Sequence, residues 1–106
     1  MLDTNNAACY MSPMIRSFAD KETEKLFRGQ KSQAVPVDVR ERALAKLLKL
    51  NAAVDVRDLR FPPGNNLEKL RGDRKGQWSI RINQQYRVCF SFEGGDAHDV
   101  EVVDYH

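Results

Sequence analysis

Two runs of alternating apolar and polar residues, separated by a short polar stretch, dominate the second half of this chain. The first run covers residues 77–83 and the second covers residues 86–92. Their apolar members are Trp78, Ile80, Ile82, Tyr86, Val88, Phe90 and Phe92. Alternation of this kind is typical of strands with one buried face. The two runs therefore predict an antiparallel hairpin with one apolar face and one polar face.

The length of the loop decides which residues face each other across this hairpin. Residues directly opposite one another in an antiparallel pair point to the same side of the sheet. A two-residue loop would pair Ile82 with Arg87 and mix the two faces, whereas the three-residue loop Asn83-Gln84-Gln85 keeps them apart. We therefore expect Ile82 to face Tyr86, and Arg81 to face Arg87.

The first half of the chain predicts a short strand and two helices. Residues 14–18 form an apolar and basic run that we interpret as a first strand. Asp20 is a suitable N-cap and Gly29 a suitable C-terminal stop for one helix. A second helix is expected from near Pro36 to near Asn51. Its apolar stripe consists of Val37, Ala43, Leu44, Leu47 and Leu48.

The remaining segments complete an α+β fold. Pro62-Pro63-Gly64 should exclude any regular element from the loop over residues 59–66. A short strand follows near residues 67–70, and a final strand is expected from about residue 98 to the end. The predicted order is β-α-α-β-β-β-β, with two N-terminal helices packed on a mainly antiparallel sheet.

Length and cysteine content narrow the class of protein. A chain of 106 residues is the size of one domain with a modest core. It has no apolar stretch long enough to span a bilayer and no secretory signal pattern. Cys9 and Cys89 do not suggest a disulfide framework and favour a reduced, cytoplasmic protein. Residues 1–13 have no usable periodicity, so we interpret them as a flexible leader, an expression remnant or a misassigned start, and 14–106 as a single domain.

Charge is distributed unevenly along the chain. Residues 57–87 carry a net charge of +5 and residues 88–106 carry −5. The basic section can be a phosphate-binding surface, or a solvated face neutralised by the acidic C-terminal third. Like charges directly across strands, such as Arg81 and Arg87, are destabilising unless something compensates them. A polyanion could compensate, because guanidinium groups suit phosphate oxygens, or Glu68 or Glu101 could pair with one arginine.

The chain ends in a carboxylate, a phenol and an imidazole, Asp104-Tyr105-His106, directly after an apolar run. Imidazole is the side chain best suited to move protons near neutral pH, although His106 can also be an unremarkable terminal residue. Asp104 could orient His106 or be a solvated carboxylate, and Tyr105 could stack on a nucleobase or cap the core. If Val100 and Val102 face the core, a bulge near Val103 or a position beyond the core rim is needed to bring His106 to the face of Arg87.

Three segments resemble a known family of bacterial toxins. They are LRGDRKGQWSIRINQQYRVCF at 70–90, VEVVDYH at 100–106 and MIRSF at 14–18. Together they are similar to the HigB toxins of the RelE/ParE superfamily, also called plasmid maintenance killer proteins, over essentially all of 14–106. The resemblance implies a type II toxin that cleaves mRNA in the ribosomal A site and contacts ribosomal RNA. It also implies attack by the 2′-hydroxyl on the adjacent phosphate without a metal or other cofactor, and silencing by a helix-turn-helix HigA-type antitoxin.

The resemblance also suggests roles for individual residues. His106 would be the general acid or base, Asp104 its supporting carboxylate, and Tyr105 the group that stacks on or orients the nucleotide. Arg87 would stabilise the charge that develops on the phosphate. Arg71 stands where some family members have lysine, and it can hold a phosphate but is a poor base. Further contacts to the RNA backbone are expected from Arg74, Lys75 and Arg81.

Two other functions remain open from the sequence. The same fold can belong to a non-enzymatic poison, like the ParE relatives that inhibit DNA gyrase, although those relatives lack a terminal constellation with histidine. A nucleic-acid-binding regulatory module that uses the basic face alone is the third possibility. Cys89 lies on the polar face by alternation and has no base beside it, so we expect it to be inert. The sequence shows no metal-ligand spacing, no phosphate-cradling glycine loop and no Ser-His-Asp arrangement.

Overall fold

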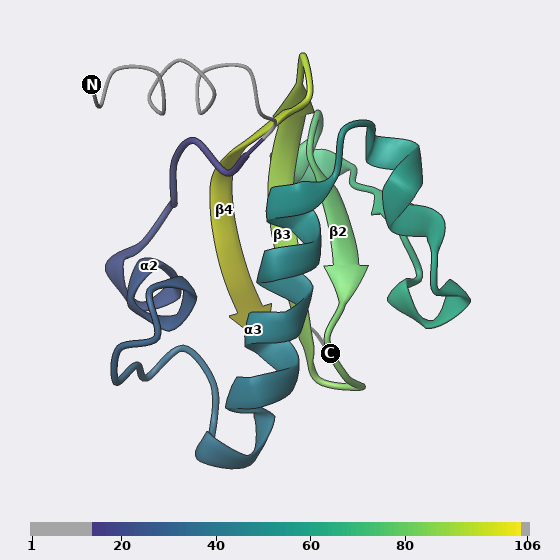
Figure 1. Ribbon diagram of the computed structural model, residues 1–106. Coiled ribbons are helices and arrows are strands. Elements are labelled where there is room, and N and C mark those ends of the chain that lie inside the picture. The colour runs from purple at the N-terminus through teal and green to yellow at the C-terminus, as the bar shows by residue number, and fades with distance from the viewer. Residues whose placement is uncertain (1–13, 105–106) are drawn as a thin grey trace, which may run out of the picture.

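The computed structural model of the protein describes residues 14–104, so the interpretation of residues 1–13 lies outside the described residues. Figure 1 shows a helix lying across one face of a sheet, with a shorter helix beside it. The elements are α2 (Lys21–Phe27), α3 (Val37–Ala52), β1 (Glu68–Lys69), β2 (Trp78–Arg81), β3 (Tyr86–Glu93) and β4 (Asp96–Asp104). The strands form one sheet in the order β1-β2-β3-β4, and all three pairings are antiparallel. The predicted α+β architecture is confirmed.

The segment before α2 lies along the outer edge of β4. Ile15 pairs with Ala97 and Phe18 pairs with Val100 in two isolated parallel bridges, rather than in a regular strand. The backbone N–H of Arg16 donates to the carbonyl of Ala97 at 2.7 Å. The expected first strand is therefore present only as an edge pairing, which makes the sheet mainly antiparallel.

The hairpin has the register predicted from its alternation. Arg81 lies opposite Arg87, and the N–H of Ile82 donates to the carbonyl of Tyr86 at 2.9 Å. The Asn83 side chain holds the three-residue loop closed, because its Oδ1 accepts from the backbone N–H groups of Gln85 and Tyr86 at 2.9 and 2.7 Å. The loop therefore keeps the apolar and polar faces of the two strands separate.

One bulge interrupts the pairing of β3 with β4. Cys89 lies opposite Glu101, but Ser91 lies opposite His98, so β4 contains one extra residue between these pairs. Asp99 has a φ of +53°, and its N–H donates to Ser17 Oγ at 2.9 Å. As a result Ala97 and Val100 are both buried on the same side of the sheet although they are three residues apart. The bulge is therefore near Asp99 and not near Val103.

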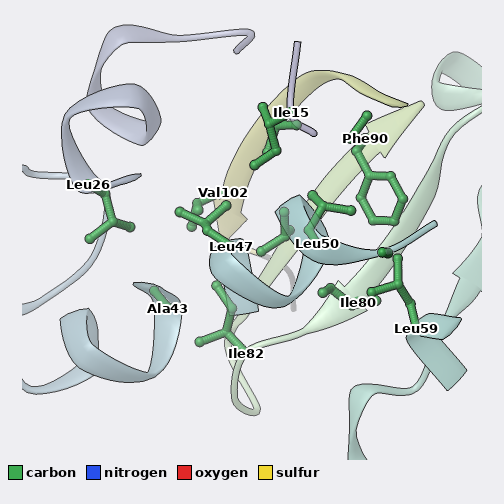
Figure 2. Packing of buried hydrophobic residues seen from close by; sticks show 14 of the residues in the cluster. Ile15, Leu26, Ala43, Leu47, Leu50, Leu59, Ile80, Ile82, Phe90 and Val102 are labelled. Carbon is green, nitrogen blue, oxygen red and sulfur yellow. The ribbon is translucent and has the colours of Figure 1, made fainter. Parts of the chain in front are cut away.

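The core lies between α3 and the apolar face of the sheet (Figure 2). Ala43, Leu47 and Leu50 of α3 are fully or almost fully buried against it. The sheet contributes Ile80, Ile82, Val88, Phe90, Val100 and Val102.

The predicted helical stripe is wrong at Val37 and Leu48, which are 75% and 51% exposed. Val37 lies in the first turn of α3, and Leu48 is rotated by about 100° from buried Leu47, because successive helix residues are separated by that angle. The helix therefore packs on the sheet through Ala43, Leu47 and Leu50. This buried stripe is rotated around the helix axis relative to the predicted stripe.

The loop before β1 is more ordered than its prolines suggest. It contains two short 3₁₀ helices, η1 (Val56–Arg60) and η2 (Pro63–Asn65), so the expectation of no regular element is wrong. The fully buried Asn65 holds this segment together. Its Nδ2 donates to the carbonyls of Leu59 and Phe61, both at 3.1 Å, and its Oδ1 accepts from Lys46 Nζ of α3.

The substitution Asn65→Ala should destabilise the fold by about 2–3 kcal/mol, because it leaves buried backbone carbonyls without their donor. The free energy of unfolding in urea measures the effect. Gln84→Ala is the matched control, since Gln84 is exposed and its removal should change stability by less than about 0.5 kcal/mol. Equal stabilities of the two variants would show that the Asn65 amide does not hold the loop.

Candidate functional site

Arg87 is the most constrained cation on the polar face of the sheet. Only 8% of this residue is exposed. Its Nε donates to Ser79 Oγ of β2 at 2.8 Å, and its Nη2 donates to the carbonyl of Asn66 at 2.5 Å. Asn66 has a left-handed φ of +45°, which turns the chain between η2 and β1 towards the sheet. The guanidinium is therefore held in one orientation by two strands and a loop.

Two groups reduce the repulsion expected between the facing arginines. Glu68 of β1 places Oε1 3.9 Å from Arg87 Nη2, at the limit of an ion pair. Arg81 directs its Nε to the carbonyl of Asn83 at 3.1 Å. Because the Glu68 side chain is 57% exposed, its attraction to Arg87 is weakened by solvent. The carbonyls of Asn83 and Asn66 also accept hydrogen bonds from the two guanidinium groups.

Arg74 lies over the same face as Arg87 but has a strong partner. Its Nη2 contacts Glu101 Oε1 of β4 at 3.1 Å, and its Nη1 donates to Gln77 Oε1 at 3.0 Å. Burial raises the pKa of the Cys89 thiol beneath these groups, and the nearby Arg74 and Arg87 offset that effect only in part. The thiol is fully buried, which agrees with the expectation that it is inert.

Arg71 and Lys75 flank a 3₁₀ turn, η3 (Gly72–Arg74), between β1 and β2. Both residues are exposed. Together with Arg74 they place three cations on one short connection beside the polar face. Arg74 contacts Glu101, whereas Arg71 and Lys75 extend from the surface on either side of it.

Asp104 ends β4 on the opposite side of the sheet from Arg87. It pairs with Tyr86, whereas Arg87 pairs with Val103, so alternation separates the two side chains. The Asp104 carboxylate is exposed and accepts from Gln85 Nε2 of the hairpin loop at 3.1 Å. The bulge expected near Val103 is absent, and the pairing from Glu101 to Asp104 is regular. Tyr105 and His106 lie outside the described residues, so their predicted roles stay predictions.

A hollow of about 380 Å³ opens beside Arg87 and the end of the hairpin. Its described lining consists of Asn66, Arg81, Asn83, Gln84 and Arg87. Two guanidinium groups and three amide side chains line the space, and the described lining includes no carboxylate. Such a set of donors can bind and stabilise an anion such as a phosphodiester. Among residues 14–104, no three His, Cys, Asp or Glu side chains are grouped so that they could hold a metal ion.

Comparison with known proteins identifies the family. A family model for the RelE-like toxin of type II toxin–antitoxin system HigB matches residues 16–106. The chain belongs to this family of toxins. Its HigB-like domain is 40% identical to Toxin HigB-1 of Vibrio cholerae over 85 residues, which is 79% of this chain and 90% of that protein. It is 33% identical over 93 residues to Endoribonuclease HigB of Proteus vulgaris, covering 88% of this chain and all of that protein.

Membership in the HigB family gives this site a biological setting. A toxin of a type II system has an antitoxin as its partner, and the chain should therefore present a surface for one. An uncharacterized protein of Haemophilus influenzae is a further relative, 31% identical over 72 residues, which is 68% of this chain and 71% of that protein. No helix within residues 14–104 has the length and apolar character to cross a membrane.

Sequence reasoning missed the residues that hold Arg87 in place. Ser79 and the carbonyl of Asn66 carry no local signal, because they meet Arg87 only after the sheet has formed. Glu68 was considered as a partner from its charge, and it does approach the guanidinium. A second missed group, the cations of α3 near the hairpin loop, could have been found from the regular helical spacing of Arg42, Lys46 and Lys49.

The substitution Arg87→Ala should lower the free energy of unfolding by about 2–3 kcal/mol, because the buried hydroxyl of Ser79 and the carbonyl of Asn66 lose a charged donor. Urea unfolding followed by circular dichroism measures the loss. Arg71→Ala is the control, as it removes an exposed arginine and should change stability by less than about 0.5 kcal/mol. An Arg87→Ala variant as stable as the Arg71→Ala variant would contradict the internal bonding of Arg87.

Proposed function

We propose that this HigB-family chain is a ribosome-dependent endoribonuclease that cleaves mRNA in the ribosomal A site and so stops translation. Two kinds of observation support the proposal. The relative from Proteus vulgaris carries the name Endoribonuclease HigB, and it is matched over its whole length. The observation that carries most weight is the hollow where Arg81 and Arg87 converge, since its described lining suits a phosphodiester.

The proposed reaction is transesterification within the RNA strand. The 2′-hydroxyl attacks the adjacent phosphorus, the bond from phosphorus to the 5′-oxygen breaks, and a 2′,3′-cyclic phosphate remains. The 2′-hydroxyl gives up a proton and the leaving oxygen takes one, so no metal or redox partner is required. Negative charge grows on the non-bridging oxygens in the transition state, and a prearranged cation stabilises it. We assign that role to Arg87, whose orientation is held by Ser79 and Asn66.

Proton transfer is assigned to the end of the chain. We propose His106 as the general acid or base, because imidazole can both accept and release protons near neutral pH. Asp104 lies on the opposite side of the sheet from Arg87, so its proposed role is to support the imidazole rather than to contact the phosphate. Tyr105 is proposed to stack on or orient the nucleotide.

The remaining cations are proposed to hold the RNA backbone. Arg71 and Lys75 are exposed and suited to phosphate contacts along the strand or on ribosomal RNA. Arg81 extends this set at the end of the hairpin. Arg74 contacts Glu101, so it contributes to RNA binding only by exchanging that carboxylate for a phosphate.

The proposed setting follows from this activity. A nuclease that acts on translating ribosomes works in the cytoplasm, and growth resumes only when an antitoxin silences it. We propose a helix-turn-helix HigA-type antitoxin as that partner, in keeping with the type II family to which the chain belongs.

The substitution His106→Ala should abolish growth arrest on induction of the protein in bacterial cells, because the proposed proton-transfer group is lost. Primer extension on mRNA with purified ribosomes should show cleavage by the wild type and at least a hundredfold less by the variant. His98→Ala is the control, since His98 pairs with Ser91 near the other end of β3 from the hairpin loop. Undiminished toxicity of His106→Ala would favour a non-enzymatic poison of the ParE kind. Equal cleavage of mRNA without ribosomes would contradict ribosome dependence.

Replacing the nucleotide at the cleavage position by its 2′-deoxy form should stop cleavage, because the attacking hydroxyl is then missing. The measurement is gel analysis of end-labelled mRNA on ribosomes, with a deoxynucleotide two positions away as the control. Continued cutting at the deoxy position would mean that water is the nucleophile.

A further inference from the structure

A groove of about 850 Å³ lies between α3, the loop around η2 and the end of the β2–β3 hairpin. It adjoins the Arg87 hollow and is lined on one side by Arg42, Lys46 and Lys49 of α3. Arg81 lines it from the end of β2. Four cations therefore face one open space, and the described lining of that space includes no carboxylate. The roles assigned above to Arg71, Arg74 and Lys75 do not involve this surface.

The three helix cations are held close together by the fold. Residues 42, 46 and 49 are four and three positions apart, which places them along one side of a helix. Lys46 is only partly exposed, and its Nζ donates to the buried Asn65. Burial lowers the pKa of the Lys46 ammonium, and the charges of Lys49 and Arg42 lower it further. The positive charges of these side chains therefore repel one another, and a bound polyanion would relieve that repulsion.

The carboxylates nearest in sequence to the groove cations do not line the groove. Asp38 and Glu41 line a different hollow, which lies on the other side of Arg42 and is about 350 Å³ in volume. Of the three groove cations of α3, Arg42 also lines this second hollow with Asp38 and Glu41, whereas Lys46 and Lys49 line only the larger groove among the hollows described.

The groove adjoins the Arg87 hollow at the edge of the sheet. Arg81, Asn83 and Gln84 line both spaces. Within residues 14–104, β1 pairs only with Trp78 and Ser79, so no strand of that part of the chain lies beside Arg81 on the β1 side of β2. A chain of phosphates can therefore pass from α3 round the sheet edge to Arg87 without crossing a strand.

We propose that this groove binds the phosphate backbone of RNA, next to the segment that Arg87 engages. The choice of RNA as the polyanion rests on the proposed nuclease function. From residue 42 to residue 49 the helix advances by seven steps of about 1.5 Å, so the three cations are spread over about 10 Å. The phosphates can belong to the mRNA beside the cleavage site or to ribosomal RNA, and binding measurements separate these sources.

The test uses the full-length double variant R42Q/K49Q, which removes two exposed cations and leaves the Lys46–Asn65 contact in place. The control K21Q/K31Q removes two exposed cations outside the groove and causes the same change in net charge. One arm measures affinity for a fluorescent single-stranded RNA, and the other measures affinity for ribosomes without mRNA. In at least one arm, R42Q/K49Q should bind about tenfold more weakly than the control. Where the loss is in the RNA arm, the dependence of log K on log salt should become shallower by about 1.4, at 0.7 for each lost phosphate contact.

The two arms identify the source of the phosphates. Loss confined to the RNA arm assigns the groove to mRNA, and loss confined to the ribosome arm assigns it to ribosomal RNA. Equal affinities of R42Q/K49Q and K21Q/K31Q in both arms would overturn the proposal. Normal binding in both arms with weakened binding of the antitoxin would also overturn it, in favour of an acidic protein segment. Wild-type protein that shows this groove-dependent binding but does not cleave mRNA would refute the nuclease function and leave the groove assignment intact.

Discussion

The buried guanidinium of Arg87 connects the β2–β3 hairpin to the loop that leads into β1. Its bonds to Ser79 and to the carbonyl of Asn66 join segments that are distant in sequence. A charged group so far from water must have its donors satisfied within the protein. The bond to Asn66 holds the loop beside the hairpin, next to the hollow that both residues line. A residue proposed to act in catalysis is therefore also part of the framework, and loss of activity on its removal has two possible causes.

Much of the fold could be predicted from periodicity, and the exceptions have physical reasons. Alternation has a period of two, so a three-residue loop keeps the apolar and polar faces of the hairpin apart whereas a two-residue loop does not. The predicted pairing of Arg81 with Arg87 was confirmed. Helical periodicity is less restrictive, because it indicates a stripe but not how the helix axis lies on the sheet. Val37 and Leu48 are therefore exposed although they continue the apolar pattern. The ordered loop around Asn65 was missed because its bonds to Lys46 and to two carbonyls depend on tertiary packing.

The candidate site could be predicted as a set of residues but not as an arrangement. The count of charged residues identified the basic section at residues 57–87. The ion pair of Arg74 with Glu101 shows that part of this positive charge is neutralised within the protein. The burial of Arg87 could not be read from its neighbours in sequence, since the groups that cover it arrive from Asn66 and Glu68. The HigB resemblance supplied roles that spacing alone does not give. The structure adds that cations lie on both sides of the open sheet edge, with Arg81 common to both surfaces.

The bulge at Asp99 divides β4 into two halves that are paired independently. Residues 96–98 pair with the end of β3, and residues 101–104 pair with its beginning. The hydroxyl of Ser17 accepts from the backbone N–H of Asp99, at the bulge between these two halves. A length change in the tight turn between the two strands would shift the first half and leave the second half in place. Insertions or deletions in that turn would therefore not change the pairing of the last residues of β4. The strand end that precedes the terminal imidazole therefore keeps its pairing with the beginning of β3 when the length of this turn changes.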